Sequence, residues 1–320
     1  MDSRLRALTT YLGSIVVFLT GATLPQARGA SPRDALLVTT TWLAQHLNDA
    51  NLVLLHVGVK SEFAKRHIPG ARHVSLMNLS VERGGLSLEM PTADDLRKDL
   101  SNLGISDGSR IVVYCDSSGI TAATRVVFTL DYARLGAATS LLDGGFEAWT
   151  RDGHDVTAAI APPRAGSLSP LVTKPIVVDD DYVLAHLKAP HMAIVDARAA
   201  AFYDGVEPGL SRVGGEGSPV VPHKTGHIAG ARSVPFATVM DDHFAFRSAA
   251  ELAAIFAKAG VQADDTIIGY CHIGQQATAT LFAARTLGHP VLLYDGSFQD
   301  WSRHDDRYPV DNPAGRGGGR

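Results

Sequence analysis

Several features that define whole classes of protein are scarce in this chain of 320 residues. It has only 2 cysteines, Cys115 and Cys271, so it is not a disulfide-rich scaffold, and a bond between them is allowed but not implied. The formal net charge is -4, and the charges are scattered without a basic stripe that could bind nucleic acid. Past the N-terminal segment, no apolar run is long enough to span a bilayer. We expect no nucleic-acid partner and no stable membrane insertion once that segment is removed.

The first 29 residues have the pattern of an export signal. Arg4 and Arg6 precede a mostly apolar run from Leu8 to Leu24, and Ala27-Arg28-Gly29 places small residues where a signal peptidase reads. The alternative is an uncleaved membrane anchor, but threonines and glycines interrupt the run, which falls short of a strongly apolar span. We expect a signal peptide at residues 1–29 and a periplasmic or secreted protein.

Three motifs occur twice along the chain in the same order, which is the signature of a duplicated unit. The pairs are His67-Ile68-Pro69-Gly70-Ala71-Arg72 with His227-Ile228-Ala229-Gly230-Ala231-Arg232, Ile111-Val112-Val113-Tyr114-Cys115 with Ile267-Ile268-Gly269-Tyr270-Cys271, and Asp143-Gly144-Gly145-Phe146-Glu147-Ala148-Trp149 with Asp295-Gly296-Ser297-Phe298-Gln299-Asp300-Trp301. Chance would not preserve the order of three separate landmarks. The two cysteines therefore occupy equivalent places in two domains.

Each copy alternates short apolar, β-branched runs with helical stretches, which is typical of a parallel sheet flanked by helices and places the fold in the α/β class. The clearest strands are Leu52 to Val57, Ile111 to Tyr114, Ile194 to Val195, Ile267 to Tyr270 and Val291 to Tyr294. We expect domain 1 at residues 36–158, a proline-rich linker at 159–175, domain 2 at 176–311 and a disordered tail at 312–320.

The second copy is longer than the first at one place. Asp196 and His227 correspond to His56 and His67, yet roughly 20 additional residues separate them, spanning Gly205 to Thr225. This insert is rich in glycine and proline, which predicts a long loop. Because it leads into a motif near the expected active site, its basic residues become candidates for ligand binding.

Cys271 follows an apolar strand and precedes a short loop that leads into a helical stretch. In parallel α/β sheets, ligands bind at the carboxyl ends of the strands. A tight loop there can direct successive backbone N–H groups inward above a helix N-terminus, and both features favour an anion such as a thiolate. An isolated cysteine after a strand is otherwise a small buried hydrophobic residue. The surrounding pattern favours a nucleophile.

The chain beyond the export signal resembles the tandem-domain rhodanese sulfurtransferases, of the thiosulfate and 3-mercaptopyruvate sulfurtransferase type. The residues that carry the resemblance are Ile194-Val195-Asp196-Ala197-Arg198, Gly226 to Phe236, Tyr270-Cys271 with its loop, and Asp295-Gly296-Ser297 with Trp301. Together these motifs are specific, whereas singly only the stretch from Gly226 to Phe236 would be. The resemblance implies two rhodanese-like domains, of which the second is catalytic and the first is not.

The resemblance also implies the chemistry. The Cys271 thiolate would take sulfane sulfur from a small donor, become a persulfide, and pass that sulfur to cyanide or a thiol. Backbone N–H groups of the following loop would hold the charged sulfur, and Gly274 would supply an angle or clearance that other residues cannot. The loop consists of His272, Ile273, Gly274, Gln275, Gln276 and Ala277. No metal and no organic cofactor is implied.

The donor is less well defined than the nucleophile. Family members that favour thiosulfate carry basic residues directly after the cysteine, where this chain has His272 and Ile273, and Phe202 replaces a further anion-binding arginine. The small Gly-Ser-Gly loop of members that use mercaptopyruvate is also absent. Thiosulfate is favoured as the donor, and 3-mercaptopyruvate comes next.

Arg198, Arg212 and Lys224 are candidates to bind the anionic end of a donor. Arg212 and Lys224 lie in the insert, where the alternative is a solvated surface loop. Arg198 belongs to a motif that the family uses mainly to fix loops around the sheet, so a structural role is favoured for it.

Cys115 is a candidate second thiol in domain 1. His56 and Gly58 stand where the second copy has an aspartate and an arginine, and the loop after Cys115 is one residue longer before its glycine. Asp116 places a negative charge beside the thiol, which should raise the pKa of Cys115. We expect Cys115 to be inactive.

Two other functions fit the sequence. One is a sulfur-carrier or sensing module that accepts sulfur from a partner protein and has little turnover on small donors, which the weakened basic loop suggests. The other is a non-catalytic binding protein that keeps the fold. Turnover on thiosulfate or 3-mercaptopyruvate separates the enzyme from the carrier, and a sulfur adduct at Cys271 excludes the binding protein.

Overall fold

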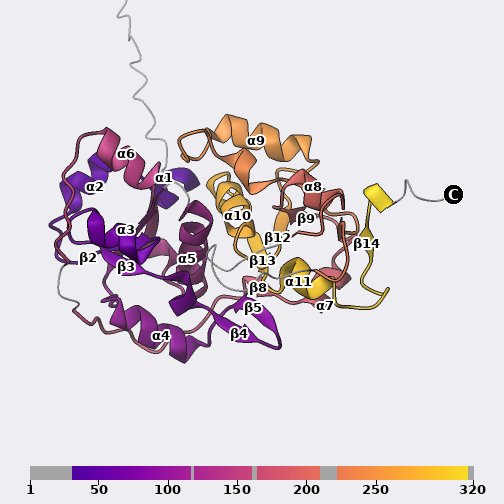
Figure 1. Ribbon diagram of the computed structural model, residues 1–320, viewed down its shortest axis with the longest axis horizontal. Helices are drawn as coiled ribbons and strands as arrows, with labels where there is room; N and C mark the ends of the chain where they lie inside the picture. Colours follow the sequence, from indigo (N-terminus) through magenta and orange to yellow (C-terminus); the bar gives the residue numbers. More distant parts are fainter. Residues whose placement is uncertain (1–30, 117–118, 161–163, 210–221, 316–320) are drawn as a thin grey trace, which may run out of the picture.

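The computed structural model describes residues 31–116, 119–160, 164–209 and 222–315 (Figure 1). The expected export signal lies outside these residues. In the part of the chain that the structure describes, no helix combines the length and the apolarity that a membrane crossing requires.

Each copy of the repeat forms a five-stranded parallel sheet. The strand order in domain 1 is β1 (Leu37–Val38), β7 (Thr139–Leu142), β6 (Arg110–Cys115), β2 (Leu52–Val57) and β3 (Arg72–Val74). The order in domain 2 is β8 (Val177–Val178), β13 (Val291–Tyr294), β12 (Thr266–Tyr270), β9 (Met192–Asp196) and β11 (Arg232–Ser233). The two sheets match strand for strand, so the predicted duplication, the α/β class and all five expected strands are confirmed.

Helices cover both faces of each sheet, as Figure 1 shows. Domain 1 contains α1 (Pro32–Leu36), α2 (Thr40–His46), α3 (Lys60–Lys65), α4 (Ala93–Asn102), α5 (Ile120–Tyr132) and α6 (Gly145–Arg151), with a hairpin of β4 (Val81–Arg83) and β5 (Leu86–Glu89). Domain 2 contains α7 (Asp180–Ala185), α8 (Ala200–Tyr203), α9 (Ala249–Lys258), α10 (Ala277–Thr286) and α11 (Ser297–Trp301), with an antiparallel pair of β10 (His227–Ile228) and β14 (Val310–Asp311).

The alternation of side chains along the strands divides each core into two layers. In domain 1, Leu54 and Val112 pack on one face with Trp149 of α6, whereas Val53 and Val113 pack on the other face. Trp149 and its counterpart Trp301 are almost fully buried in domains 1 and 2, as expected for core residues.

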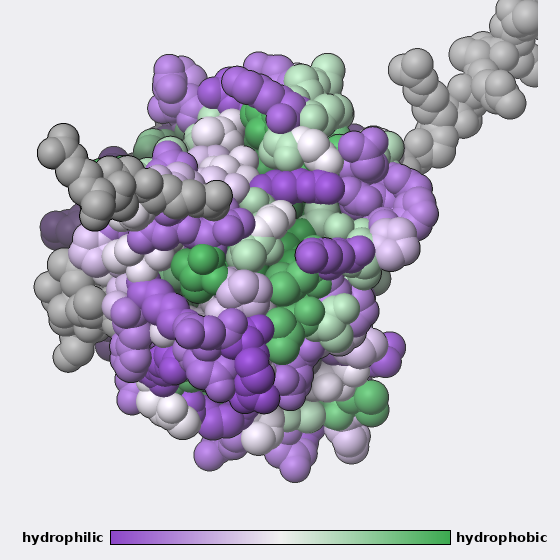
Figure 2. All heavy atoms as spheres, turned by 90° about the vertical axis from the view of Figure 1, so that its right-hand side faces the viewer, coloured by the Kyte–Doolittle hydropathy of each residue, from purple (hydrophilic) through white to green (hydrophobic). Residues whose placement is uncertain are grey.

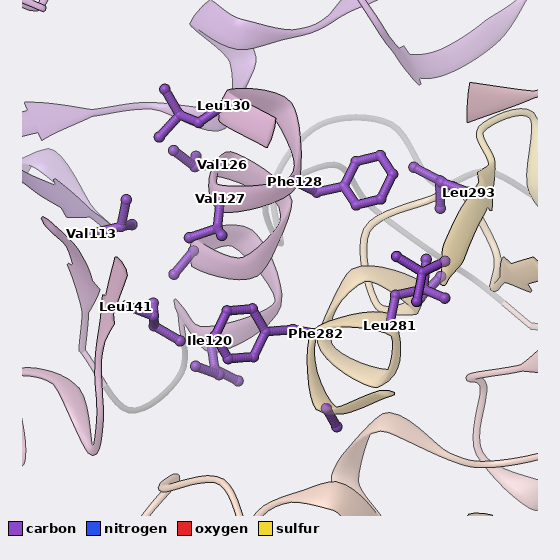
Figure 3. Close-up of a cluster of buried hydrophobic side chains, with 14 of the residues drawn as sticks. Val113, Ile120, Val126, Val127, Phe128, Leu130, Leu141, Leu281, Phe282 and Leu293 are labelled. Atoms are coloured by element: carbon purple, nitrogen blue, oxygen red, sulfur yellow. The ribbon is translucent and has the colours of Figure 1, made fainter. Parts of the chain in front are cut away.

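The two domains share one of these layers. A single apolar cluster contains residues of α5 in domain 1 and of α10 in domain 2, and Figure 3 shows the two helices side by side with Phe128 and Phe282 between them. Burial of this kind contributes about 25 cal/mol per Å² of apolar area removed from water. The helices that meet here are the ones that follow the two cysteine loops, so the interface lies close to both.

Two segments expected to be irregular are tied to the domains. In the predicted linker, Leu168 is buried and the Gly166 N–H donates to the Ser101 carbonyl at 2.7 Å. The sequence predicts a disordered tail from residue 312, but the Ala314 N–H donates to the Asp204 carbonyl at 2.9 Å. Asp204, which directly follows α8, therefore ties this part of the chain to domain 2.

Candidate active site

Cys271 lies at the carboxyl end of β12, the central strand of the second sheet. Its side chain is fully buried. The Phe298 N–H donates to the Cys271 carbonyl at 3.0 Å, and the Gln299 N–H donates to the His272 carbonyl at 3.0 Å. The Cys271 N–H donates to Ser297 Oγ at 3.3 Å. The start of α11 therefore holds the cysteine and its neighbour in place.

The Cys271 loop, residues 271–277, turns at Gly274 before α10 begins at Ala277. The φ angle of Gly274 is +77°, in the left-handed region that favours glycine. A Cβ at this position would lie 2.9 Å from the Asp295 carbonyl oxygen. Gly274 supplies both the backbone angle and the clearance that the sequence predicted.

His272 does not add positive charge to this loop. Burial first, and the nearby Arg198 charge second, lower the pKa of His272 to about 4, so its ring is neutral at pH 7. The ring packs edge-on against Phe202, with 4.8 Å between the centroids. His272 also lines a small hollow with Pro222, Phe298 and Gln299.

On the side of the molecule that Figure 2 shows, apolar side chains gather near the middle and hydrophilic ones surround them.

Arg198 and Asp196 form a buried ion pair at the end of β9. The Arg198 Nη2 and Asp196 Oδ2 atoms are 2.5 Å apart, and the side chains are 1% and 0% exposed. Arg198 Nη2 also donates to the Gly226 carbonyl at 2.7 Å. Burial lowers the pKa of Arg198, but Asp196 more than offsets this and leaves it above its usual value, with a smaller contribution from Cys271. Arg198 is thus a permanent cation whose charge is paired mainly with Asp196 and interacts more weakly with Cys271.

The three candidate donor-binding residues are in different situations. Arg198 is buried and bound within the protein, which supports the structural role over direct contact with a donor. The Lys224 ammonium lies 3.3 Å from the Asp305 carbonyl and 3.9 Å from the Asp306 carboxylate, so part of its charge is already paired. Arg212 lies outside the described residues.

Cys115 occupies the equivalent place at the end of β6 and is nearly fully buried. Burial raises the pKa of the Cys115 thiol, and the negative charges of Glu147 and Asp116 raise it further. The expected direction is confirmed, although burial and Glu147 outweigh the residue that the sequence singled out. Domain 1 has no counterpart of Arg198, because Gly58 occupies that position. The contact found there instead joins Asp116 Oδ2 and His56 Nε2, which are 3.4 Å apart.

Arg125, which contacts the Cys271 loop, was missed by reasoning from the sequence. Arg125 of α5 is fully buried, and its Nη1 atom lies 2.6 Å from Asp295 Oδ1 and 3.1 Å from the Gly274 carbonyl oxygen. Its Nη2 atom donates to the Leu88 carbonyl at 2.6 Å. The available signal was an arginine directly before the apolar run Val126-Val127-Phe128, since an arginine buried in a helix requires a charged partner.

Among the described residues, two groups bring a histidine and two aspartates within metal-ligating distance of one another: Asp180, Asp300 and His304, and His191, Asp264 and Asp265. His304 Nε2 lies 3.0 Å from Asp180 and His191 Nδ1 lies 2.8 Å from Asp264, so each histidine already has a carboxylate partner. Neither group contains a residue of the Cys271 loop.

Comparison with known proteins identifies the class. The family model for the rhodanese-like domain matches twice, at residues 39–152 and 179–304. Thiosulfate sulfurtransferase of Rattus norvegicus is 29% identical over 282 residues, which cover 83% of this chain and 92% of that protein. 3-Mercaptopyruvate sulfurtransferase of the same species is 26% identical over 281 residues, covering 83% and 91%. A sulfur carrier protein of Thermus thermophilus is 29% identical over 276 residues, covering 83% and 93%.

Solved structures agree on the fold. The anaerobic ergothioneine biosynthesis enzyme from Chlorobium limicola superposes with a TM-score of 0.75 at 21% sequence identity, covering 88% of this chain and 71% of that chain. The chain therefore belongs to the rhodanese family and carries two of its domains. It is a sulfurtransferase, an enzyme that moves sulfur between a small donor and an acceptor.

Proposed function

We propose that Cys271 carries the sulfur as a persulfide and that thiosulfate is the preferred donor, with 3-mercaptopyruvate next. One observation carries the proposal: Cys271 directly follows the central strand β12, buried in a loop that is bent by Gly274 and held by the start of α11. The loop geometry favours an anionic sulfur, whereas the charge of Arg198 is largely offset by Asp196. The names of the relatives support the choice of donors.

With thiosulfate, the reaction consists of two displacements at the transferred sulfur. The Cys271 thiolate attacks the outer sulfur, the bond between the two thiosulfate sulfurs breaks, and sulfite leaves with its electron pair. The resulting persulfide is attacked by cyanide, and thiocyanate leaves as the cysteine thiolate is restored. Neither step needs a separate oxidant or reductant, and charge balances in both. A thiol acceptor would take the sulfur in the same way.

Among the described residues, the arginines that interact with the Cys271 loop offer no exposed charge to an anion. Arg198 and Arg125 are both fully buried, and each is paired with an aspartate. Their pairs leave little net charge, so most of the attraction for a dianionic donor comes from backbone N–H groups of the Cys271 loop. Because Cys271 has no exposed surface, neighbouring residues have to move before a donor reaches its sulfur.

The alternative role is a sulfur carrier with little turnover on small donors. A two-donor assay of the wild type decides between the roles. The enzyme is expected to release thiocyanate from thiosulfate and cyanide at many turnovers per minute, and to release pyruvate from 3-mercaptopyruvate more slowly. A single stoichiometric release with either donor, followed by no further turnover, would instead support the carrier.

Export remains a separate proposal. It rests on the pattern of residues 1–29, which lie outside the described residues. Expression of the full chain in a Gram-negative host, followed by fractionation and N-terminal sequencing, is expected to give a periplasmic protein that begins after Gly29. An uncleaved protein in the membrane fraction would point to an anchor.

A further inference from the structure

Arg125 joins both domains at the Cys271 loop. Its guanidinium comes from the middle of α5 in domain 1 and is fully buried. Nη1 is 2.6 Å from Asp295 Oδ1 and 3.1 Å from the Gly274 carbonyl oxygen, both in domain 2. Nη2 is 2.6 Å from the Leu88 carbonyl oxygen. One side chain thus connects a helix, the β4–β5 hairpin, the end of β13 and the loop that follows Cys271.

The contact with Gly274 sets the direction of a peptide group in the loop. In a trans peptide the carbonyl and the following N–H point in opposite directions. Because the Gly274 carbonyl points to Arg125, the N–H of Gln275 points to the other side of the loop. The left-handed φ of Gly274, +77°, permits this orientation. Arg125 therefore stabilises one orientation of the peptide group between Gly274 and Gln275 in this loop.

The surroundings hold Arg125 firmly. Asp295 Oδ2 accepts a hydrogen bond from the Met90 N–H at 2.7 Å, so both oxygens of this carboxylate contact domain 1. Leu88, whose carbonyl Arg125 engages, has a φ of +67°, which a residue with a side chain adopts only when its surroundings require it. Backbone strain of this kind persists only where the surrounding contacts hold a residue firmly, so Leu88 is fixed in position beside Arg125.

Domain 1 lacks the matching arrangement among the described residues. Asp143 corresponds to Asp295, and it accepts from the Phe246 N–H at 3.2 Å as Asp295 accepts from Met90. However, the arginine beside Asp143 is Arg33 of α1, which is 23% exposed and donates to the carbonyls of Phe246 and Arg247.

The helix position equivalent to Arg125 is an alanine in α10. The Thr124 and Thr278 hydroxyls lie 3.0 Å apart across the interface, which aligns Arg125 with Ala279. A buried arginine thus contacts the Cys271 loop, whereas the equivalent position in domain 2 holds an alanine. An interface with a purely structural role would not require this difference between the two domains.

We propose that Arg125 is a positioning residue for sulfur transfer: domain 1 fixes the Cys271 loop through the contacts of Arg125 with Asp295 and the Gly274 carbonyl. The inference rests on the proposed persulfide chemistry. It assigns to domain 1 a part in the reaction that does not involve Cys115.

Single-turnover persulfide formation with thiosulfate tests this role in the full-length protein. Arg125→Gln is expected to lower the saturating rate about 10- to 100-fold, because the loop loses its fixed orientation around the reacting sulfur. The half-saturating donor concentration should change less than about threefold. Arg125→Lys, which keeps the charge, should recover part of the rate. Arg33→Gln is the matched control and should keep the rate within about twofold.

The outcomes separate this inference from the proposed function. If the wild type forms no persulfide at Cys271, the proposed function fails. If the wild type forms the persulfide and the folded Arg125→Gln and Arg125→Lys variants form it at the same rate, the positioning role is wrong. The role is also wrong if Arg33→Gln lowers the rate as much as Arg125→Gln does. Thermal unfolding of each variant establishes folding, and should Arg125→Gln not fold, Arg125→Lys and Asp295→Asn give the same comparison.

Discussion

The two cysteine loops occupy equivalent places in two copies of one fold, yet the charges around them differ. Near Cys271, a buried arginine paired with Asp196 supplies a cation. Near Cys115, Glu147 and Asp116 supply negative charge, and with burial they raise the pKa of the thiol. Duplication has kept the strand that presents the sulfur and changed the charged residues around it. The position of a cysteine at a strand end is therefore insufficient to infer activity.

The most severe test of this comparison replaces each cysteine in turn. We expect Cys271→Ser to lower sulfur transfer by more than about 1,000-fold, because the nucleophile is removed. Cys115→Ser should keep the rate within about twofold, because its thiol is held in the protonated form. Steady-state thiocyanate release measures both. Equal losses in the two variants would show that the cysteines act together.

Removing the ion pair at the end of β9 is expected to have the next largest effect, which is on the stability of the fold. Asp196→Asn leaves the Arg198 charge buried without its partner, so we expect the free energy of unfolding to fall by about 3 kcal/mol. The matched change in domain 1 is Asp116→Asn, where the carboxylate is 28% exposed and the loss should stay below about 1 kcal/mol. Urea unfolding monitored by fluorescence measures both. A similar loss in the two domains would mean that the fully buried pair contributes no more to stability than the pair with the partly exposed Asp116.

The third test concerns the shape of the Cys271 loop. Gly274→Ala places a side chain at a φ of +77° and 2.9 Å from the Asp295 carbonyl. We expect sulfur transfer to fall about 10-fold as the loop shifts. Gly153→Ala is the control, since Gly153 has a φ of +78° with nothing within 4 Å of the added carbon, and it should affect only stability. Unchanged activity in Gly274→Ala would show that the loop tolerates displacement.

Glu89 gives the smallest effect and tests the asymmetry of the domain interface. Burial, followed by the Asp295 charge, raises the pKa of Glu89 from 4.5 to about 7. An acid whose folded pKa is raised contributes stability that is complete below its unfolded pKa and is lost as pH rises through the folded value. The wild type should therefore lose about 1 kcal/mol relative to Glu89→Gln between about pH 5 and pH 8, after allowance for solvent screening.

Urea unfolding at several pH values measures the effect of Glu89→Gln. The matched control is Glu82→Gln, an exposed position in the same hairpin, which should keep the wild-type pH dependence. Parallel curves for the wild type and Glu89→Gln would contradict the assignment. The equivalent position in domain 2 is Ala245, so this pH dependence belongs to one side of the interface.

Much of the fold could be predicted from the sequence because duplication made its landmarks visible twice. Apolar runs ending at Cys115 and Cys271 located the central strands, and Gly274 signalled a position that a side chain cannot occupy. These features are local, since a few consecutive residues determine a strand, a turn or a strained angle.

The contacts between domains could not be predicted in the same way. The partners Arg125, Leu88 and Asp295 are far apart in the sequence, and only packing of α5 against α10 brings them together. The burial of individual basic side chains could not be predicted either. The residues next to Arg198 and Lys224 in the sequence do not indicate that Arg198 is enclosed and that Lys224 lies partly in solvent. Long-range packing thus determines which basic residues remain available to a donor.

The central claim is that sulfur resides on Cys271 and not on Cys115, and peptide mapping by mass spectrometry after incubation with thiosulfate tests it most directly. Alkylation at neutral pH before digestion traps any persulfide. The expected result is a gain of one sulfur atom on the peptide that contains Cys271 and an unchanged peptide for Cys115. Sulfur on the Cys115 peptide, or on neither peptide in a protein that turns over, would contradict the assignment.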